Sequence, residues 1–305
     1  MVRSDTASVI FRPIVFENPD RLVPPAAWIG HIPFAFWAME VLRPAIFVEL
    51  GTQSGNSYSA FAQAVQRLKF PTQCYAVDTW RGDEHAGFYT EDVFENFSRY
   101  HDARFANFSR LVRSTFDEAL GHFGDRTIDL LHLDGLHIFE NVAHDFQSWL
   151  PKLSAGGIVL FHDINVRELG FGVWKLWSEL SSRYPHFAFN HSHGLGVLGV
   201  GKNIPAELKW LFALSEEAAD AETATFVRTF FARLGSPLVE RAELGQMAAR
   251  LATMQRERDD LARQSEHSAA ELQAMRAELA RQSDRRMAEL RAICTDLDRS
   301  LAEVK

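Results

Sequence analysis

Short apolar runs alternate with longer amphipathic stretches between about residues 44 and 200 of the chain. Runs of four to eight β-branched and apolar residues predict strands, and apolar residues at spacings of three and four predict helices. The predicted strands are Ile46 to Glu49, Cys74 to Asp78, Leu111 to Ser114, Ile128 to Asp134 and Gly157 to His162. The predicted helices include Asn56 to Leu68, Phe116 to Phe123 and Phe139 to Leu150. This alternation is typical of a parallel sheet covered by helices on both faces.

Two further apolar runs, "HFAFNH" and "GLGVLGVG", follow the fifth strand and a Trp-rich helix. Only a few residues, among them Gly194, separate the two runs. Because a parallel crossover needs a dozen or more residues, so short a link predicts an antiparallel hairpin. The predicted fold class is therefore α/β, with five parallel strands finished by an antiparallel pair.

Past Gly245 the chain contains no Gly, Pro or aromatic residue, and its apolar residues follow heptad spacing. The predicted seam consists of Leu244, Met247, Leu251, Met254, Leu261, Leu272, Met275, Leu279, Leu290, Cys294, Leu297, Leu301 and Val304. Three polar residues occupy core positions, Arg258, Ser265 and Ser268. The frame slips between Gln282 and Met287, which we interpret as a stutter. The pattern predicts a coiled coil of unspecified oligomer state; a solvated single helix is the alternative.

These patterns divide the chain into four parts. Residues 1–43 are an N-terminal segment with an aromatic-rich covering helix, and residues 44–203 are the α/β domain. Residues 204–236 are a helical linker, expected to end at Gly235-Ser236-Pro237. Residues 238–305 are the coiled coil, through which we expect the chain to form a homo-oligomer or to bind a partner helix.

Composition and charge exclude several classes of protein. The formal net charge is -8, and residues 241–305 carry 12 basic and 12 acidic residues, so the negative excess lies in residues 1–240. This distribution disfavours nucleic acid as a partner. The two cysteines, Cys74 and Cys294, indicate no disulfide framework, and neither a signal peptide nor an apolar run of about 18 residues is found. We therefore expect a cytoplasmic protein without a transmembrane segment.

Acidic and glycine residues follow the first two predicted strands. Glu49 ends the first strand, and Gly51 and Gly55 precede a helix that opens with Asn56. Glycines let the backbone turn tightly and approach a ligand, and a helix N-terminus offers unpaired N–H groups. Asp78 ends the second strand, where a carboxylate can accept both hydroxyls of a ribose. The absence of G-x-G-x-x-G disfavours a nicotinamide-dependent enzyme, so the pattern favours another adenosine-containing cofactor.

Charged residues also follow the fourth and fifth strands. Asp134 and His137 come after an apolar run, and His162 and Asp163 end the fifth strand. Because the carboxyl ends of parallel strands open into the ligand crevice, we expect these four side chains to converge. They could hold a divalent ion that activates an acceptor hydroxyl, or His137 or His162 could act as a general base. The alternative is that Asp134 and His162 only cap strand ends.

Three other histidines lie in predicted loops. His85 could line an acceptor pocket, whereas His191 and His193 are expected to lie in a surface turn of the hairpin.

Three stretches, "ELGTQSGNSYSAF", "VDTWRGDEHAGFY" and "IDLLHLDGLHIFENVAHDFQSWLPKLSAGGIVLFHDINV", resemble the class I S-adenosylmethionine-dependent methyltransferases. Within that class the chain is most similar to the methyltransferase 24 family, which has a D-G-x-H element and a late G-G-x-x-x-x-H-D. Similar domains methylate sugars on antibiotics and surface polysaccharides, and some are fused to glycosyltransferases. The resemblance covers about residues 25 to 202. It implies a Rossmann-like seven-stranded sheet in the order 3-2-1-4-5-7-6 with strand 7 antiparallel.

The resemblance also implies roles for individual residues. Those expected around the methionine moiety of S-adenosylmethionine are Glu49, Gly51, Thr52, Ser54 and Gly55. Asp78 would hold the ribose, and the residues expected near the adenine are Trp80, Ser114 and Thr115. Metal-dependent sugar methyltransferases of this group bind magnesium with an aspartate at the place of Asp134 and two carboxylates after strand five. Here the second place is His162-Asp163, so the three residues could hold magnesium, a softer ion such as manganese, iron or zinc, or no metal.

The predicted function is that of an S-adenosylmethionine-dependent O-methyltransferase acting on a hydroxyl of a sugar or polysaccharide-related acceptor. Asp134, His137 and His162 are its predicted catalytic residues. A divalent metal, magnesium or manganese, is a possible second cofactor. The alternative is a scaffold module of a polysaccharide-assembly complex that binds cofactor weakly or not at all and is organised through its coiled coil.

Overall fold

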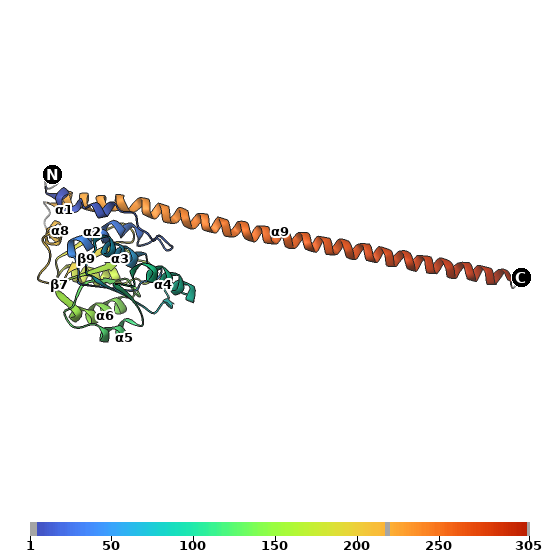
Figure 1. Cartoon of the computed structure of the whole chain (residues 1–305), viewed down its shortest axis with the longest axis horizontal. Coiled ribbons are helices and arrows are strands. Elements are labelled where there is room, and N and C mark those ends of the chain that lie inside the picture. Colours follow the sequence, from blue (N-terminus) through green and yellow to red (C-terminus); the bar gives the residue numbers. More distant parts are fainter. Residues whose placement is uncertain (1–4, 217–219, 304–305) are drawn as a thin grey trace. The chain divides into compact units, whose positions relative to one another are not determined.

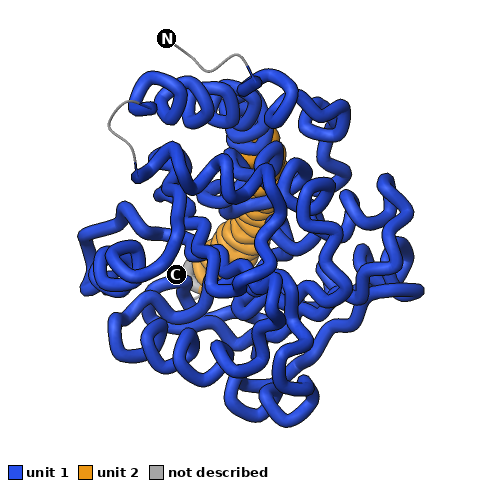
Figure 2. Tube along the Cα trace, turned by 90° about the vertical axis from the view of Figure 1, so that its left-hand side faces the viewer, with its two compact units in different colours: residues 1–244 blue, residues 245–305 orange. Residues whose placement is uncertain are grey.

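The computed structural model describes residues 5–216 and 220–303 of the chain. The chain divides into two compact units, residues 1–244 and residues 245–305 (Figure 2). The first unit is built around a seven-stranded sheet, and the second consists of the later part of one long helix.

The sheet has the strand order β5-β2-β1-β6-β7-β9-β8. Its strands are β1 Ile46–Leu50, β2 Gln73–Asp78, β5 Ser109–Arg113, β6 Ile128–Leu133, β7 Leu153–His162, β8 His186–Phe189 and β9 Leu195–Gly199. β9 pairs antiparallel with β7 and β8, and the other neighbouring pairs are parallel. Strands β3 (Gly82–Asp83) and β4 (Gly87–Phe88) form a separate two-stranded ribbon, so the strand numbers of the main sheet skip 3 and 4. Counted without it, the order is 3-2-1-4-5-7-6 with strand 7 antiparallel, so the predicted fold class is confirmed.

Helices pack on both faces of the sheet (Figure 1). One face is covered by α2 Ile32–Leu42, α3 Asn56–Leu68, α4 Glu91–Phe105, α8 Ala206–Glu216 and the beginning of α9 Ala221–Glu303. The other face is covered by α5 Phe116–Ala119, α6 Phe139–Trp149 and α7 Val173–Ser181. Shorter elements are α1 Thr6–Ile10 and the 3-10 turns Pro13–Phe16, Ile29–His31, Leu120–His122 and Leu150–Lys152. The two faces form two separate apolar cores.

The covering helix α2 is buried on nearly all sides. Phe34 and Trp37 are about 1% exposed, although the helix lies near the start of the chain. The ring of Phe231 from α9 packs 5.5 Å from Phe34 and 6.2 Å from Trp37, and 5.6 Å from Phe189 of β8. The first turns of α9 therefore complete the core around α2.

Helix α9 continues through Gly235, Ser236 and Pro237, where we expected a helical pair to end. A proline inside a helix removes one hydrogen bond and costs about 3 kcal/mol. The helix continues because apolar residues on both sides of the proline pack against the first unit, among them Phe231 before it and Ala242 after it. The expected break is therefore wrong, and tertiary packing outweighs the local signal.

Beyond residue 244, α9 is helical to Glu303, as the heptad pattern requires. The pairing of this helix in a coiled coil and the four-part division of the chain stay predictions. Val304 lies outside the described residues, and the side chain of Leu301 lies outside those whose surroundings are described. Over residues 5–216 and 220–303, no helix has a stretch long and apolar enough to cross a bilayer.

Candidate functional site

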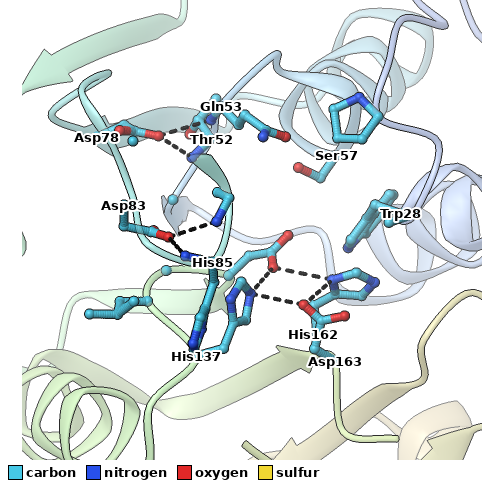
Figure 3. A pocket seen from close by; sticks show the side chains of 18 of the residues that line it. Trp28, Thr52, Gln53, Ser57, Asp78, Asp83, His85, His137, His162 and Asp163 are labelled. Carbon is cyan, nitrogen blue, oxygen red and sulfur yellow. Dashed lines mark hydrogen bonds and ion pairs between the residues drawn. The ribbon is translucent and has the colours of Figure 1, made fainter. Parts of the chain in front are cut away.

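A cavity of about 700 Å³ opens at the carboxyl ends of the central strands β1, β2, β6 and β7 (Figure 3). Parallel strands place the residues that follow them at one sheet edge, so segments far apart in sequence meet here. Among the predicted site residues, those that line it are Gly51, Thr52, Ser54, Asp78, Thr115, Asp134, His137, His162 and Asp163. Small-molecule sites usually have volumes of about 300–1,000 Å³, and this cavity lies within that range.

The loop between β1 and α3 forms one wall of the cavity and depends on two glycines. Gly51 has a φ of +87°, and a Cβ there would collide with the carbonyl oxygen of Asp134. Gly55 has a φ of +80°, and a Cβ there would collide with the ring of Phe97. Both positions need glycine. Gly51 lines the cavity, whereas Gly55 shapes the loop from behind.

Asp78 ends β2 and fastens this glycine loop. Its Oδ2 accepts hydrogen bonds from the backbone N–H groups of Thr52 at 2.8 Å and Gln53 at 2.9 Å. Its Oδ1 accepts one from the N–H of Trp80 at 2.6 Å. A carboxylate can accept about four hydrogen bonds, so capacity remains for a ligand hydroxyl. Asp78 therefore both lines the cavity and holds the glycine loop in place.

Glu49 does not line the cavity, contrary to the expectation from the sequence. It is fully buried, and its Oε2 accepts a hydrogen bond from Nδ1 of His132 at 2.8 Å. Burial raises the pKa of Glu49, and the bond from His132 partly offsets this. His132 Nε2 in turn accepts a hydrogen bond from the indole N–H of Trp28 at 3.1 Å, and Trp28 lines the cavity. Glu49 thus acts on the wall through His132 and Trp28, and its carboxylate also interacts with Ser57, which lines the cavity.

Trp80 is also placed differently from the expectation. It is 1% exposed, its indole N–H donates to the carbonyl of Gln53 at 2.9 Å, and its ring packs 4.9 Å from that of Phe94. A left-handed backbone, with φ of +51°, turns the side chain away from the cavity and into the core. The prediction that Trp80 lies against the adenine is therefore wrong.

Ser114 does not line the cavity either, but Thr115 beside it does. Thr115 caps α5: its hydroxyl accepts from the N–H of Glu118 at 3.3 Å, and the Glu118 carboxylate accepts from the N–H of Thr115 at 3.1 Å. Tyr89 and Phe116 line this part of the cavity and were not predicted. Tyr89 accepts a hydrogen bond from the side chain of Gln53 at 2.9 Å, so it closes the cavity over the glycine loop.

The four charged residues at the ends of β6 and β7 converge, as predicted, and Figure 3 shows three of them, His137, His162 and Asp163. His137 Nε2 lies 2.8 Å from Asp163 Oδ2 and 3.6 Å from Asp134 Oδ1. His162 Nδ1 lies 3.2 Å from Asp134 Oδ1 and 3.3 Å from Asp163 Oδ2. Ligand atoms of Asp134, His162 and Asp163 all lie within 4.8 Å of one another, which is a spacing that a metal ion could bridge. Their catalytic and metal-binding roles stay predictions.

The charges of this cluster determine which of its groups carry protons. Burial alone would lower the pKa of His137, but the carboxylates of Asp134 and Asp163 outweigh it and raise that pKa to about 9. The same carboxylates raise the pKa of His162 well above its usual value, against the effect of burial. Although burial opposes it, His162 holds the pKa of both Asp134 and Asp163 below their ordinary range. At neutral pH both histidines are therefore cations, and in this state neither can serve as the predicted general base.

His162 is oriented from behind by the hairpin turn between β8 and β9. Its Nε2–H donates to the carbonyl of Ser192 at 3.0 Å, so Nδ1 faces the two carboxylates. His193 in the same turn is exposed, and its Nδ1 lies 3.1 Å from Asp163 Oδ1. His191 is half-buried, and its Nε2–H donates to the carbonyl of Gly30 at 3.1 Å. The surface-turn expectation is therefore right for the exposure of His193, but it missed the contact with Asp163.

An aromatic stack borders the charged cluster. The ring of Phe171 lies 4.5 Å from that of His137 and 4.6 Å from that of His85, with interplanar angles of 10° and 15°. All three residues line the cavity, and a role of His85 toward an acceptor stays a prediction. Phe171 lies in the loop after β7, and no spacing in the sequence marks it. The stack fixes the ring plane of His137 beside Asp163.

Asp145 of α6 lines the cavity without a side-chain partner, and burial raises its pKa to about 7. Because this pKa is raised in the folded state, the carboxyl costs nothing below about pH 4 and destabilises the fold as the pH rises through 7. The full cost would be about 4 kcal/mol, and water in the cavity reduces it to about 1–2 kcal/mol.

We therefore expect Asp145→Asn to melt about 2–6 °C higher than the parent protein at pH 8, with no difference at pH 4. Thermal unfolding by circular dichroism at both pH values tests this. Glu95→Gln, at an exposed position of α4, is the control, and its melting temperature should equal that of the parent protein at both pH values. A gain in stability that is equal at both pH values would contradict the prediction.

Comparisons with known proteins agree with this arrangement. Residues 48–164 match the model of a family described as a methyltransferase domain, a stretch that contains the glycine loop, Asp78 and the charged cluster. An uncharacterized protein of Sinorhizobium fredii is 44% identical over 229 residues, which are 75% of this chain and 25% of the relative. The chain thus spans about a quarter of the length of that curated relative.

Solved structures are also similar to this chain at low sequence identity. A methyltransferase of Podospora anserina with bound S-adenosylhomocysteine is 14% identical, with a TM-score of 0.44, over 65% of this chain and 97% of that one. The O-methyltransferase TomG of Streptomyces achromogenes, in complex with S-adenosylmethionine, is 14% identical, with a TM-score of 0.42, over 66% and 91%. The match to the family model covers about two fifths of the chain, so what it shows is that residues 48–164 are similar to a methyltransferase domain.

Proposed function

We propose that this chain is an S-adenosylmethionine-dependent O-methyltransferase that acts on a hydroxyl group of a sugar or a polysaccharide-related acceptor. One observation carries the proposal: two sets of residues with different chemistry share a single cavity. The glycine loop and Asp78 suit a nucleoside-containing cofactor, and the cluster of Asp134, His137, His162 and Asp163 suits acid-base chemistry. The shared cavity provides the proximity that transfer between two bound molecules requires.

The residues around the glycine loop fit the cofactor. Gly51 lines the wall and, because it lacks a Cβ, lets the loop pack against the carbonyl of Asp134, and Asp78 keeps capacity to accept a hydroxyl. The hydroxyl of Thr52 is buried, lines the cavity and has no hydrogen-bond partner, so a ligand can satisfy it. When bound, S-adenosylmethionine supplies a methyl group activated on a sulfonium centre.

Asp134, His162 and Asp163 also fit a divalent cation. They offer two carboxylates and one imidazole, a donor set that suits manganese, iron or zinc better than magnesium, which prefers oxygen. The bond from His162 Nε2–H to Ser192 leaves Nδ1 directed at the carboxylates, an orientation of the kind that holds metal-binding imidazoles. A bound cation would supply a lowered pKa for an acceptor hydroxyl.

His137 is the residue whose protonation must change for it to act as a base. Its proton is held by Asp134 and Asp163, so in the cation-free cluster it can only donate a hydrogen bond at neutral pH. If the charges of the two carboxylates are neutralised, the cause of the raised pKa of His137 is removed. His137 can then take a proton from the hydroxyl group of the acceptor molecule. His137 is fixed in orientation by the ring of Phe171, so it needs no large movement to do so.

The sugar class of the acceptor is supported by the resemblance of the sequence and by the polar lining around His137. Asp83, His85 and Glu168 line the same cavity and offer acceptors and donors for several hydroxyl groups. The scaffold alternative gains no support, because both the glycine loop and the charged cluster are intact. A cytoplasmic location and assembly through residues 238–305 are parts of the proposal.

Isothermal titration of chelator-treated protein with S-adenosylmethionine, with and without added Mn²⁺, tests the cofactor. We expect a dissociation constant in the micromolar range, and no binding heat under either condition would contradict the proposal. The acceptor is tested separately by release of S-adenosylhomocysteine with a set of nucleotide sugars and methyl glycosides. Binding of S-adenosylmethionine without release of S-adenosylhomocysteine with any of these sugars would contradict only the proposal that the acceptor is a sugar.

A further inference from the structure

One stripe of α9 exposes large apolar side chains along the whole second unit. Twelve Leu, Met and Ile side chains between Leu244 and Leu297 are 50 to 66% exposed. Burying such a side chain is worth about 1.5–3 kcal/mol, and a helix draws most of its stability from packing such a stripe. The stripe is therefore the surface that a partner helix would cover.

The spacing of the stripe limits which helix can cover it. Its apolar residues keep heptad spacing up to Leu279, but the next one, Met287, follows after eight residues rather than seven. Knobs-into-holes packing requires the seams of both helices to shift at the same height. A partner must therefore carry the same break in phase, and a second copy of this chain carries it.

Two alignments of a second copy bring the breaks together. In a parallel pair in register, each seam residue faces its own copy, so Leu272 faces Leu272 and Ser265 faces Ser265. In an antiparallel pair centred on the break, Leu272 faces Cys294, and Ser265 falls opposite position 301, an apolar position of the heptad pattern. The parallel alignment keeps polar core positions together.

Arg258 favours two helices over three or more. It occupies a core position, yet it is exposed and its Nη2 lies 2.6 Å from Asp259 Oδ1 of its own helix. In a two-stranded coil a long charged side chain can extend from the core position to water, whereas higher oligomers enclose it. A parallel pair also places Glu271 of one helix beside Arg276 of the other, at flanking positions that attract.

We propose that residues 244–303 pair with a second copy of this chain as a parallel, two-stranded coiled coil in register. The arrangement places the two Cys294 residues opposite each other in the core, where each thiol faces its own copy. The proposal does not depend on methyl transfer, and its test needs neither cofactor nor acceptor.

Cys294 reports on the alignment in the full chain. It is an exposed free thiol, whereas Cys74 is buried and burial raises its pKa, so Cys294 is the thiol that reacts. We expect sedimentation equilibrium at micromolar concentration to give a dimer, and a short bismaleimide to link the two copies through Cys294. Cys294→Ser should remain a dimer that cannot be linked.

A matched control moves the thiol to the far side of the helix. The double variant Ala292→Cys with Cys294→Ser places it at the position farthest from the seam, where we expect linking at least about 10-fold slower. Leu272→Cys in the parent chain tests the antiparallel alignment, because the introduced thiol would then be linked to Cys294 of the other copy. That linkage, a monomer or a trimer would each overturn the proposal.

Discussion

Replacing Asp134 with Asn should raise the dissociation constant for Mn²⁺ by at least about 100-fold. Asp134 supplies one of the two carboxylates of the three-residue cluster, and Asn keeps the shape of the side chain but loses its charge. Changes to residues that only support a metal ligand already cost about 10–100-fold in affinity, so loss of a ligand should reach the upper end of that range. Titration of chelator-treated protein with Mn²⁺, followed calorimetrically and by electron paramagnetic resonance, measures the effect.

Asp125→Asn is the matched control for this experiment. Asp125 is an exposed acid that forms an ion pair with Lys152 at 2.8 Å, outside the cavity. We expect its affinity for Mn²⁺ to equal that of the parent protein. Equal affinity in both variants would show that the ion binds elsewhere, and no binding to the parent protein would remove the metal from the proposed function while leaving the cofactor assignment intact.

The second large effect concerns Asp78. We expect Asp78→Ala to weaken binding of S-adenosylmethionine by at least about 100-fold, measured by isothermal titration. Each charge-assisted hydrogen bond is worth about 1.5–3 kcal/mol, and about 1.4 kcal/mol is a factor of ten in affinity. Asp78 also accepts hydrogen bonds from the backbone N–H groups of Thr52 and Gln53. The substitution removes both bonds, so the glycine loop should loosen.

Two measurements distinguish these contributions. Hydrogen exchange at the amides of Thr52 and Gln53 reports the loop, and exchange that stays slow would show that the loss of affinity comes from the ligand contact alone. Asp83→Ala is the control, because Asp83 lines the same cavity and accepts from the N–H of His85 at 2.7 Å in a different loop. Equal losses in both variants would contradict a specific role for Asp78.

The sheet could be predicted because each strand carries its own local signal. Apolar runs of the right length mark the strands, and the short link at Gly194 marks the antiparallel pair. The prediction failed at Glu49 because β1 continues for one residue to Leu50, which keeps Glu49 inside the sheet. A single residue in the end of a strand decides whether a position lies inside the sheet or at its edge, and boundaries are the least certain part of any sequence pattern.

Contacts between distant segments could not be predicted at all. Trp28 and Phe171 reach the cavity from segments that no motif marks, and Trp80 leaves it because of one left-handed residue. Convergence of the acids and histidines followed from the rule for parallel strands, but their protonation depends on distances between side chains. The raised pKa of His137 therefore became evident only once Asp163 was placed 2.8 Å away.

The packing of Phe231 against α2 also has a consequence for synthesis of the chain. Trp37 and Phe34 emerge from the ribosome almost 200 residues before Phe231 covers them. At about 5–20 residues per second, that interval lasts about 10–40 s. Over that interval the nascent chain carries α2 without its cover from α9, and the unit can close only when the start of α9 has left the exit tunnel.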